Sequence, residues 1–571
     1  MKRTLLTLFF PILLLTACQQ PPETITADTI LINGNIYTVD KDNPRAEAIA
    51  IGGGRILLAG ANKEVQELQG DSTRVIDLQG RFAMPGFIEG HGHFSGLGQS
   101  LIHLNFLKSQ SWEEIVRMVE EAAREAEPGE WITGRGWHQE KWAQPLERSV
   151  LGYPYHDKLS AVSADNPVVL RHASGHSLLA NARAMEMAGI TAETPDPFGG
   201  EIVRDSRGEA IGVFEETAMA LIMDAYSEYQ ATLSPEQKEK EWLRGIKLAE
   251  EECLRKGVTS FQDAGSSFLE IERYSELAEK GELGLRLWAM ISGREDGLEE
   301  KAAGFPRIGI GNGFFTVRAI KGYMDGALGA FGAWLLAPYA DKPDSYGKNT
   351  TSIDTLKKWA EIAYDNGLQY CVHAIGDRGN REVLDIFEEQ FQRNPARKGL
   401  RWRVEHAQHL DTADIPRFRE MEVIASMQGI HCTSDAPFVV KRLGEERARL
   451  GAYPWRSLLD NGVVIANGTD APVEDVDPIE CFYASVTRKR ADTGMEFFPE
   501  QRMTREEALY SYTLGNAFAA FEEEDKGSLE KGKMADIVVL SNDLASCSDE
   551  EILETEVLMT MVDGKVKYEK E

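Results

Sequence analysis

Two histidines that follow an apolar segment are the first residues in this chain that could do chemistry. The run Phe82–Ile88, interrupted by a Pro-Gly pair, predicts a short buried strand that leads into His91-Gly92-His93. Because strand residues alternate between faces, His91 and His93 should project to the same side. Two neutral imidazoles at a strand end suit a divalent metal such as zinc; the alternative is a pair of loop histidines with no ligand role.

More side chains of metal-binding type follow later strands. Seven further β-type segments alternate with helical ones, as in a parallel α/β sheet: residues 257–262, 285–291, 316–320, 369–372, 402–405, 423–427 and 463–468. With the opening strand they make eight, the number that closes a (β/α)8 TIM barrel, whose active sites lie at the C-terminal strand ends. The residues at these ends are His91, His93, Lys321, His373, His406 and Asp470. We therefore expect one metal site at one edge of the barrel.

The segments around this barrel predict two further parts. Residues 28–81 and 525–571 are both rich in short β-type runs and turn signals, and we expect them to form one small composite β-sandwich beside a barrel of residues 82–524. About 165 residues separate the first two barrel strands, far more than one helix and its loops need. We interpret residues 100–255 as an inserted α/β subdomain that folds over the barrel mouth.

Polar and aromatic clusters in this insertion are candidates for the substrate pocket. They contain Trp137 and His138 in one segment and His172 and His176 in another. Asp325, just beyond the fourth strand, is a further pocket candidate. For each of them a purely structural role is the alternative.

The N-terminus has the pattern of an export signal. Lys2 and Arg3 precede an apolar stretch that is too short to span a bilayer comfortably, and residues 1–17 end at a lipoprotein-type box with Cys18 as the residue to be lipidated. Residues 18–27 are polar and suit a tether. We expect an exported bacterial lipoprotein, anchored through its lipid alone, on the periplasmic or outer-membrane face if the cell is diderm.

Charge and length limit the other partners. A net charge of -30 argues against nucleic acid, because phosphate binding needs a basic surface. The 571 residues suit two to four domains. A small molecule is the expected partner, and the oligomeric state stays open, with a homodimer among the alternatives.

The motifs together resemble the amidohydrolase superfamily, more narrowly its family-3 branch with the N-substituted formamide deformylases. The segments that carry the resemblance are Pro85–His93, Ile320–Gly329, Val372–Asp377, Arg403–Gln408, Gly468–Pro472, Tyr512–Ala517 and Gly527–Asp536. The resemblance implies a barrel plus a composite sandwich, a divalent metal centre of one or two ions and hydrolysis of a C–N bond. It also implies metal or site roles for His91, His93, His373, His406 and Asp470.

Two positions in the resemblance need comment. Lys321 lies where this branch has a lysine that CO2 can carboxylate to bridge two metals; the alternative is a lysine that pairs with Asp325 and has no metal role. Glu89 stands where the superfamily more often has Asp, and we expect this to change the support of the site only modestly.

The chemistry expected of these residues is amide hydrolysis. A bound metal lowers the pKa of its water from about 15.7 toward about 7. Asp470 is the expected proton shuttle to the leaving nitrogen, and His406 or His373 could stabilise the oxyanion if free of metal. A ligand-binding or sensing lipoprotein on an inactive scaffold is the alternative class, and an ester hydrolase, deaminase or isomerase on the same site also remains open.

Overall fold

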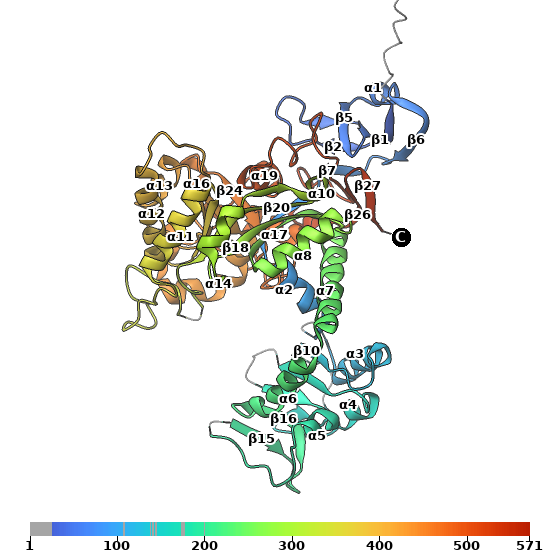
Figure 1. Ribbon diagram of the computed structural model, residues 1–571, viewed down its shortest axis with the longest axis vertical. Coiled ribbons are helices and arrows are strands. Elements are labelled where there is room, and N and C mark those ends of the chain that lie inside the picture. The colour runs from blue at the N-terminus through green and yellow to red at the C-terminus, as the bar shows by residue number, and fades with distance from the viewer. Residues whose placement is uncertain are drawn as a thin grey trace, which may run out of the picture.

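The computed structural model describes residues 26–570 apart from 107–108, 138, 140–141, 143–145, 173–176, 199 and 330. The predicted signal segment 1–17, the lipidation site Cys18 and most of the tether 18–27 lie outside the described residues. Figure 1 shows three parts along the long axis: sheets from both chain ends at the top, the barrel in the middle and the insertion at the bottom. Within the described ranges, no helix has the length and apolar character that a membrane span requires.

Eight parallel strands form the central barrel, in the order β8-β17-β18-β20-β21-β22-β23-β24. This confirms the predicted (β/α)8 barrel, and each predicted strand overlaps an observed one. The strands are β8 (Phe87–Gly92), β17 (Val258–Ser266), β18 (Arg286–Ser292), β20 (Phe315–Tyr323), β21 (Gln369–Ala374), β22 (Arg403–His406), β23 (Ile424–Gln428) and β24 (Ile465–Gly468).

Helices cover the outside of the barrel and bury its largest apolar core. The first, α2 (Phe94–Ile102), packs so closely on α7 (Pro235–Arg255) that a Cβ at Gly98 would lie 2.3 Å from the Gly245 carbonyl oxygen. The other helices are α8 (Phe268–Glu279), α9 (Leu298–Lys301), α10 (Ile310–Gly313), α11 (Ile353–Asn366), α12 (Asp377–Gln392), α13 (Ile415–Glu420), α14 (Gly429–Leu443), α15 (Glu445–Gly451), α16 (Trp455–Asp460), α17 (Pro478–Thr487), α18 (Arg505–Ser511) and α19 (Leu514–Ala519).

Side chains close the barrel at the seam between β24 and β8. The Asn516 amide donates to the carbonyl oxygens of Ile88 (2.5 Å) and Asn467 (2.7 Å), one on each side of the seam. Beyond the strand end, the backbone N–H of Asp470 donates to the carbonyl oxygen of His91 at 2.8 Å. The Glu89 carboxylate also crosses the seam and accepts hydrogen bonds from the backbone and the hydroxyl of Thr469, at 2.7 and 3.1 Å.

The predicted single strand over Phe82–Ile88 is wrong, because the chain changes sheets in its middle. Residues Phe82–Pro85 form β7, which pairs with β25 (Ile537–Leu540), and only β8 enters the barrel. Gly86 lies at the change of direction, where a Cβ would be 2.2 Å from the Thr259 side chain. The contact leaves room for glycine alone, so the Pro-Gly pair divides one apolar run between two sheets.

Strands β7 and β25 belong to a sheet that combines both chain ends, and a second sheet beside it comes from the N-terminal segment alone. Residues of both sheets form an apolar core separate from that of the barrel. One sheet has the order β5-β4-β1-β6: β5 (Arg55–Gly60), β4 (Ala48–Gly52), β1 (Ala27–Ile32) and β6 (Gln69–Asp77). The other has the order β27-β26-β25-β7-β2-β3, with β27 (Lys565–Glu569), β26 (Val557–Val562), β2 (Asn35–Tyr37) and β3 (Arg45–Ala46). Two short helices occur in these segments: α1 (Asn62–Gln66) packs on β4, whereas α20 (Asp549–Leu553) packs on α17 of the barrel.

The insertion between β8 and β17 has its own six-stranded sheet with an apolar core on each face. Its elements are β9 (Leu104–Asn105), α3 (Trp112–Glu125), β10 (Ile132–Trp137), the paired strands β11 (Ser149–Val150) and β12 (Tyr153–Pro154), α4 (Asp157–Val162), β13 (Val168–His172), β14 (Ser177–Ala180), α5 (Ala182–Met187), β15 (Gly200–Arg204), β16 (Ala210–Glu216) and α6 (Met219–Thr232). In Figure 1 it lies on the side of the barrel opposite the terminal sheets, and α7 leads back from it.

Candidate metal centre

His91 is the most deeply buried of the predicted ligands. It lies in β8, and its Nδ1 is 2.5 Å from the Oε2 of Glu405, which is fully buried on β22. Burial alone would raise the pKa of Glu405, but His91 and Lys321 outweigh it and lower that pKa to about 2. Burial also lowers the pKa of His91. A carboxylate that accepts from the Nδ1–H of a neutral imidazole turns the Nε2 lone pair of His91 toward the site.

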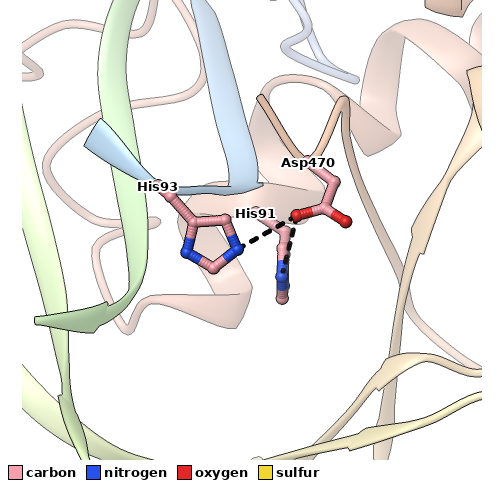
Figure 2. Close-up of side chains that lie close together, drawn as sticks. All are labelled: His91, His93 and Asp470. Atoms are coloured by element: carbon pink, nitrogen blue, oxygen red, sulfur yellow. Dashed lines mark ion pairs between the residues drawn. The ribbon is translucent and has the colours of Figure 1, made fainter. Parts of the chain in front are cut away.

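Asp470 joins His91 to His93. Its Oδ1 is 3.2 Å from Nε2 of His93 and 3.6 Å from Nε2 of His91, and Figure 2 shows the carboxylate turned toward both rings. Burial would raise the pKa of Asp470, but the surrounding imidazoles outweigh burial and hold this pKa well below its ordinary value. His93 precedes the first residue of α2 and is partly exposed, so it marks the open side of the cluster.

Lys321 lies inside β20 and faces the same cluster. Its Nζ is 3.2 Å from Nε2 of His91, and its side chain is almost completely buried. Burial lowers the pKa of Lys321, because the ammonium form loses its hydration. No hydrogen bond or ion pair joins Lys321 to Asp325 among the described residues.

His373 and His406 complete the predicted set from β21 and β22. Their ring centroids are 4.4 Å apart, and the ring of His406 is 4.7 Å from that of His91. Burial lowers the pKa of His373 to about 3. Nδ1 of His406 is 2.7 Å from Oε1 of Gln428, an acceptor, so the His406 lone pair is on Nε2.

Unusual backbone angles bring two of these side chains inward. His406 follows Glu405 directly, and strict alternation would place them on opposite faces of β22. His406 has a φ of 75°, which turns its ring toward the same cluster as Glu405. Asp470 has a φ of 61° just after β24. Both residues therefore occupy the left-handed region at the site, a conformation that costs about 1–3 kcal/mol and is concentrated at functional sites.

Asp325 has a positioning role in this structure. Its two carboxylate oxygens accept hydrogen bonds from the backbone N–H groups of Trp334 (2.7 Å), Ile375 (2.9 Å) and Gly376 (2.9 Å). The nearer oxygen is 3.8 Å from Nε2 of His373. Asp325 thus fixes the loop after β20 against the end of β21, instead of projecting freely into a pocket.

The pocket candidates of the insertion are not brought to the histidine cluster. Trp137 is fully buried, its Nε1 donates to the Leu170 carbonyl oxygen at 2.8 Å, and its ring packs 4.6 Å from that of His172. His172 contacts Gln139, with 3.1 Å between Nε2 and Oε1. Trp137 and His172 thus pack within the insertion itself. The other two candidates, His138 and His176, lie outside the described residues.

Three residues of the site escaped the sequence analysis: Glu405, Gln428 and His431. Glu405 and Gln428 are the hydrogen-bond partners of Nδ1 in His91 and in His406, respectively. Their signal was their place at the ends of the sixth and seventh strands, next to or in line with the predicted ligands. His431 lies in the first turn of α14, with its Nε2 3.9 Å from Oδ2 of Asp470. A helix position gave no strand-end signal.

The possible ligand atoms in the cluster suit a divalent cation. Donor atoms of His91, His93 and Asp470 all lie within 4.8 Å of one another, and the same holds for His406, His431 and Asp470. Nε2 of His373 and Nε2 of His431 are buried and have no hydrogen-bond partner among the described residues, and Oδ1 of Asp470 faces the rings of His91 and His93. Buried polar atoms are rarely left unsatisfied, and imidazole with carboxylate is a donor set that zinc accepts.

An eight-stranded parallel barrel with imidazoles and a carboxylate at its C-terminal strand ends is an arrangement typical of metal-dependent hydrolases. Residues 74–568 match the Amidohydrolase family, and the chain belongs to it. It is 32% identical over 560 residues to the protein LONG AFTER FAR-RED 3 of Arabidopsis thaliana. The match covers 96% of this chain and 93% of that protein. It is 28% identical over 558 residues to N-substituted formamide deformylase of Arthrobacter pascens, over 95% and 98% of the two chains.

A solved structure gives the same result. The crystal structure of an uncharacterized metal-dependent hydrolase from Pyrococcus furiosus superposes with a TM-score of 0.70 and 28% identity. The match covers 91% of this chain and 100% of that chain.

Glu405 should be needed for tight metal binding. In Glu405→Gln the partner of His91 loses its negative charge, so His91 becomes a less basic ligand, and the affinity for zinc should fall about 10- to 100-fold. Competition with a coloured zinc chelator measures this. Glu361→Gln, at an exposed position on α11, is the matched control and should bind zinc like the parent. Unchanged affinity in Glu405→Gln would mean that this carboxylate does not support a ligand.

Proposed function

We propose that the protein is a metal-dependent amidohydrolase that cleaves the C–N bond of an N-formyl, other N-acyl or cyclic amide. The observation that carries the proposal is the largely buried cluster of imidazoles and one carboxylate at the C-terminal strand ends of the barrel, in which Nε2 of His373 and of His431 have no hydrogen-bond partner among the described residues. Similarity to N-substituted formamide deformylase over 95% of this chain supports the C–N bond as the target.

His91, His93, His373, His406 and Asp470 are the residues that would hold zinc. When bound, such a cation supplies Lewis acidity toward the carbonyl and lowers the pKa of water from about 15.7 to about 7. The carboxylate of Glu405 and the amide of Gln428 keep the imidazoles of His91 and His406 in the tautomer that a ligand needs.

Asp470 is the residue we assign to proton transfer. Its carboxylate lies between His91, His93 and His431, and it accepts the proton that water loses as it attacks the carbonyl carbon. It then gives this proton to the leaving nitrogen as the C–N bond breaks, which releases the amine and the carboxylic acid. Protonation is essential because an amide anion is a poor leaving group.

Amide hydrolysis is tested on a panel of N-alkyl and N-aryl formamides with zinc-loaded protein that lacks residues 1–18. We expect formate and amine to appear in equal amounts, and Asp470→Asn to lower kcat by about 10²–10⁴-fold. Asp492→Asn, an exposed position, is the matched control for loss of a carboxylate. If the panel and a set of N-acyl and cyclic amides all stay intact after zinc loading, the proposal is overturned in favour of a binding protein.

Lys321 is proposed as a carbamate that bridges two cations. Burial lowers its pKa, which favours the neutral amine that attacks CO2. In this step an N–C bond forms and the amine loses a proton, leaving a carboxylate at the end of the side chain. The 3.2 Å between Nζ of Lys321 and Nε2 of His91 supports the proposal, because the end of this side chain lies beside an expected metal ligand.

Lys321→Met should lower the zinc content from about two ions to about one per chain, because a bridging ligand is lost. Elemental analysis after dialysis with bicarbonate measures this, and the exposed Lys398→Met serves as control. About one ion in both the parent and Lys321→Met would make Lys321 structural, and the hydrolase proposal would stand without a carbamate.

Export and lipid anchoring through Cys18 are proposed from the N-terminal segment of the sequence. In cells fed a radiolabelled fatty acid, the parent should carry label and fractionate with membranes, whereas Cys18→Ser should carry none, because the Cys18 thiol is the group to which the lipid is attached. Label in Cys18→Ser, or an unlabelled parent, contradicts the anchor. The barrel and its chemistry do not depend on this outcome.

A further inference from the structure

His431 is a buried histidine that faces the cluster and has no assigned role. It is 7% exposed and lies in the first turn of α14, directly after β23. Its Nε2 has no hydrogen-bond partner among the described residues and lies 3.9 Å from Oδ2 of Asp470. Its ring is stacked on that of His406, with centroids 6.2 Å apart. A buried ring nitrogen aimed into a site without a partner implies a ligand or substrate atom there.

In each of these rings, the hydrogen bond made by Nδ1 determines whether Nε2 carries a proton or a lone pair. In a neutral imidazole one nitrogen carries a proton and the other a lone pair. His91 and His406 each face an acceptor oxygen through Nδ1, from Glu405 and Gln428, so each presents a lone pair on Nε2. This is the state that a metal ligand needs.

Nδ1 of His431, in contrast, faces a hydrogen-bond donor. Its Nδ1 lies 3.1 Å from Nε2 of Gln408, an amide N–H donor. The Nδ1 lone pair accepts this hydrogen bond, so the ring proton is on Nε2. His431 therefore offers the site an N–H group, although its position among His406 and Asp470 is that of a possible ligand. A cation is repelled by an N–H dipole, whereas a developing oxyanion is stabilised by it.

We propose that His431 is a catalytic residue that donates its Nε2–H to the carbonyl oxygen of the bound amide. The assignment rests on the proposed amide hydrolysis. As water adds to the carbonyl carbon, negative charge grows on this oxygen, and a donor already fixed by Gln408 stabilises the charge without reorientation. His406 cannot take this role, because its Nδ1–H is donated to Gln428 and its Nε2 carries the lone pair.

The test measures kcat, KM and zinc content of His431→Ala on the most reactive amide of the panel. We expect kcat to fall about 10²–10³-fold, the cost of one oxyanion donor, with KM and zinc per chain unchanged. Loss of one zinc ion per chain would make His431 a ligand and overturn the proposal. Equal zinc with kcat within threefold of the parent would also overturn it, because the ring would then have no part in the reaction.

Gln408→Glu is the matched variant for the tautomer. A carboxylate at this position accepts from Nδ1, which moves the ring proton away from Nε2. We expect kcat to fall as in His431→Ala while zinc binding is retained or tightened, since a new lone pair faces the cluster. Full activity in Gln408→Glu would contradict the assigned tautomer. His431→Gln, which keeps a side-chain N–H, should recover part of the kcat lost in His431→Ala and shows that folding is intact if its thermal midpoint matches the parent.

Different results would overturn the proposed amide hydrolysis and the proposed role of His431. An unmodified protein that cleaves no amide overturns amide hydrolysis, and the role of His431 with it. An active parent whose His431→Ala variant is equally active overturns only the role of His431.

Discussion

Closure of the barrel between β24 and β8 is the constraint on which the metal centre depends. The seam is held by the Asn516 amide and the Glu89 carboxylate, each bonded across it, and by the backbone bond from Asp470 to His91. Because Asp470 follows β24 and His91 lies near the end of β8, the distance between these two residues is set by this seam. The glutamate at position 89 accepts two hydrogen bonds from Thr469 and in this way supports the junction.

Near that junction, the residue that contacts Nδ1 determines whether a histidine offers the site a lone pair or an N–H group. Nδ1 of His91 and of His406 faces an acceptor oxygen, whereas Nδ1 of His431 faces an amide donor. Neighbouring histidines therefore present opposite groups to the site: a lone pair from the first two and an N–H group from the third. The left-handed backbone at His406 and Asp470 brings side chains inward that strand geometry would direct elsewhere. The site is thus specified as much by amides and by backbone angles as by the histidines themselves.

The sequence predicts the eight barrel strands well, since buried parallel strands are continuous apolar runs and their polar ends meet at one edge. It fails where packing overrides pattern. Phe82–Ile88 looks like one strand, but the chain changes direction at Gly86 and its two halves pair in different sheets. Asp325 looks like a pocket residue, but three backbone N–H groups occupy it. His431 reaches the cluster from a helix, and a residue pattern contains no information about which nitrogen carries the proton.

The pairing of β25 with β7 has a consequence for the order in which the molecule is made. Strand β7 ends at residue 85, and its neighbours β25 to β27 extend to residue 569, so this sheet lacks three of its six strands until translation is nearly complete. A ribosome-bound chain exposes the unpaired edge of β7 throughout the synthesis of the barrel, and such edges invite aggregation. The topology therefore leaves this edge open to aggregation until the last strands have been made.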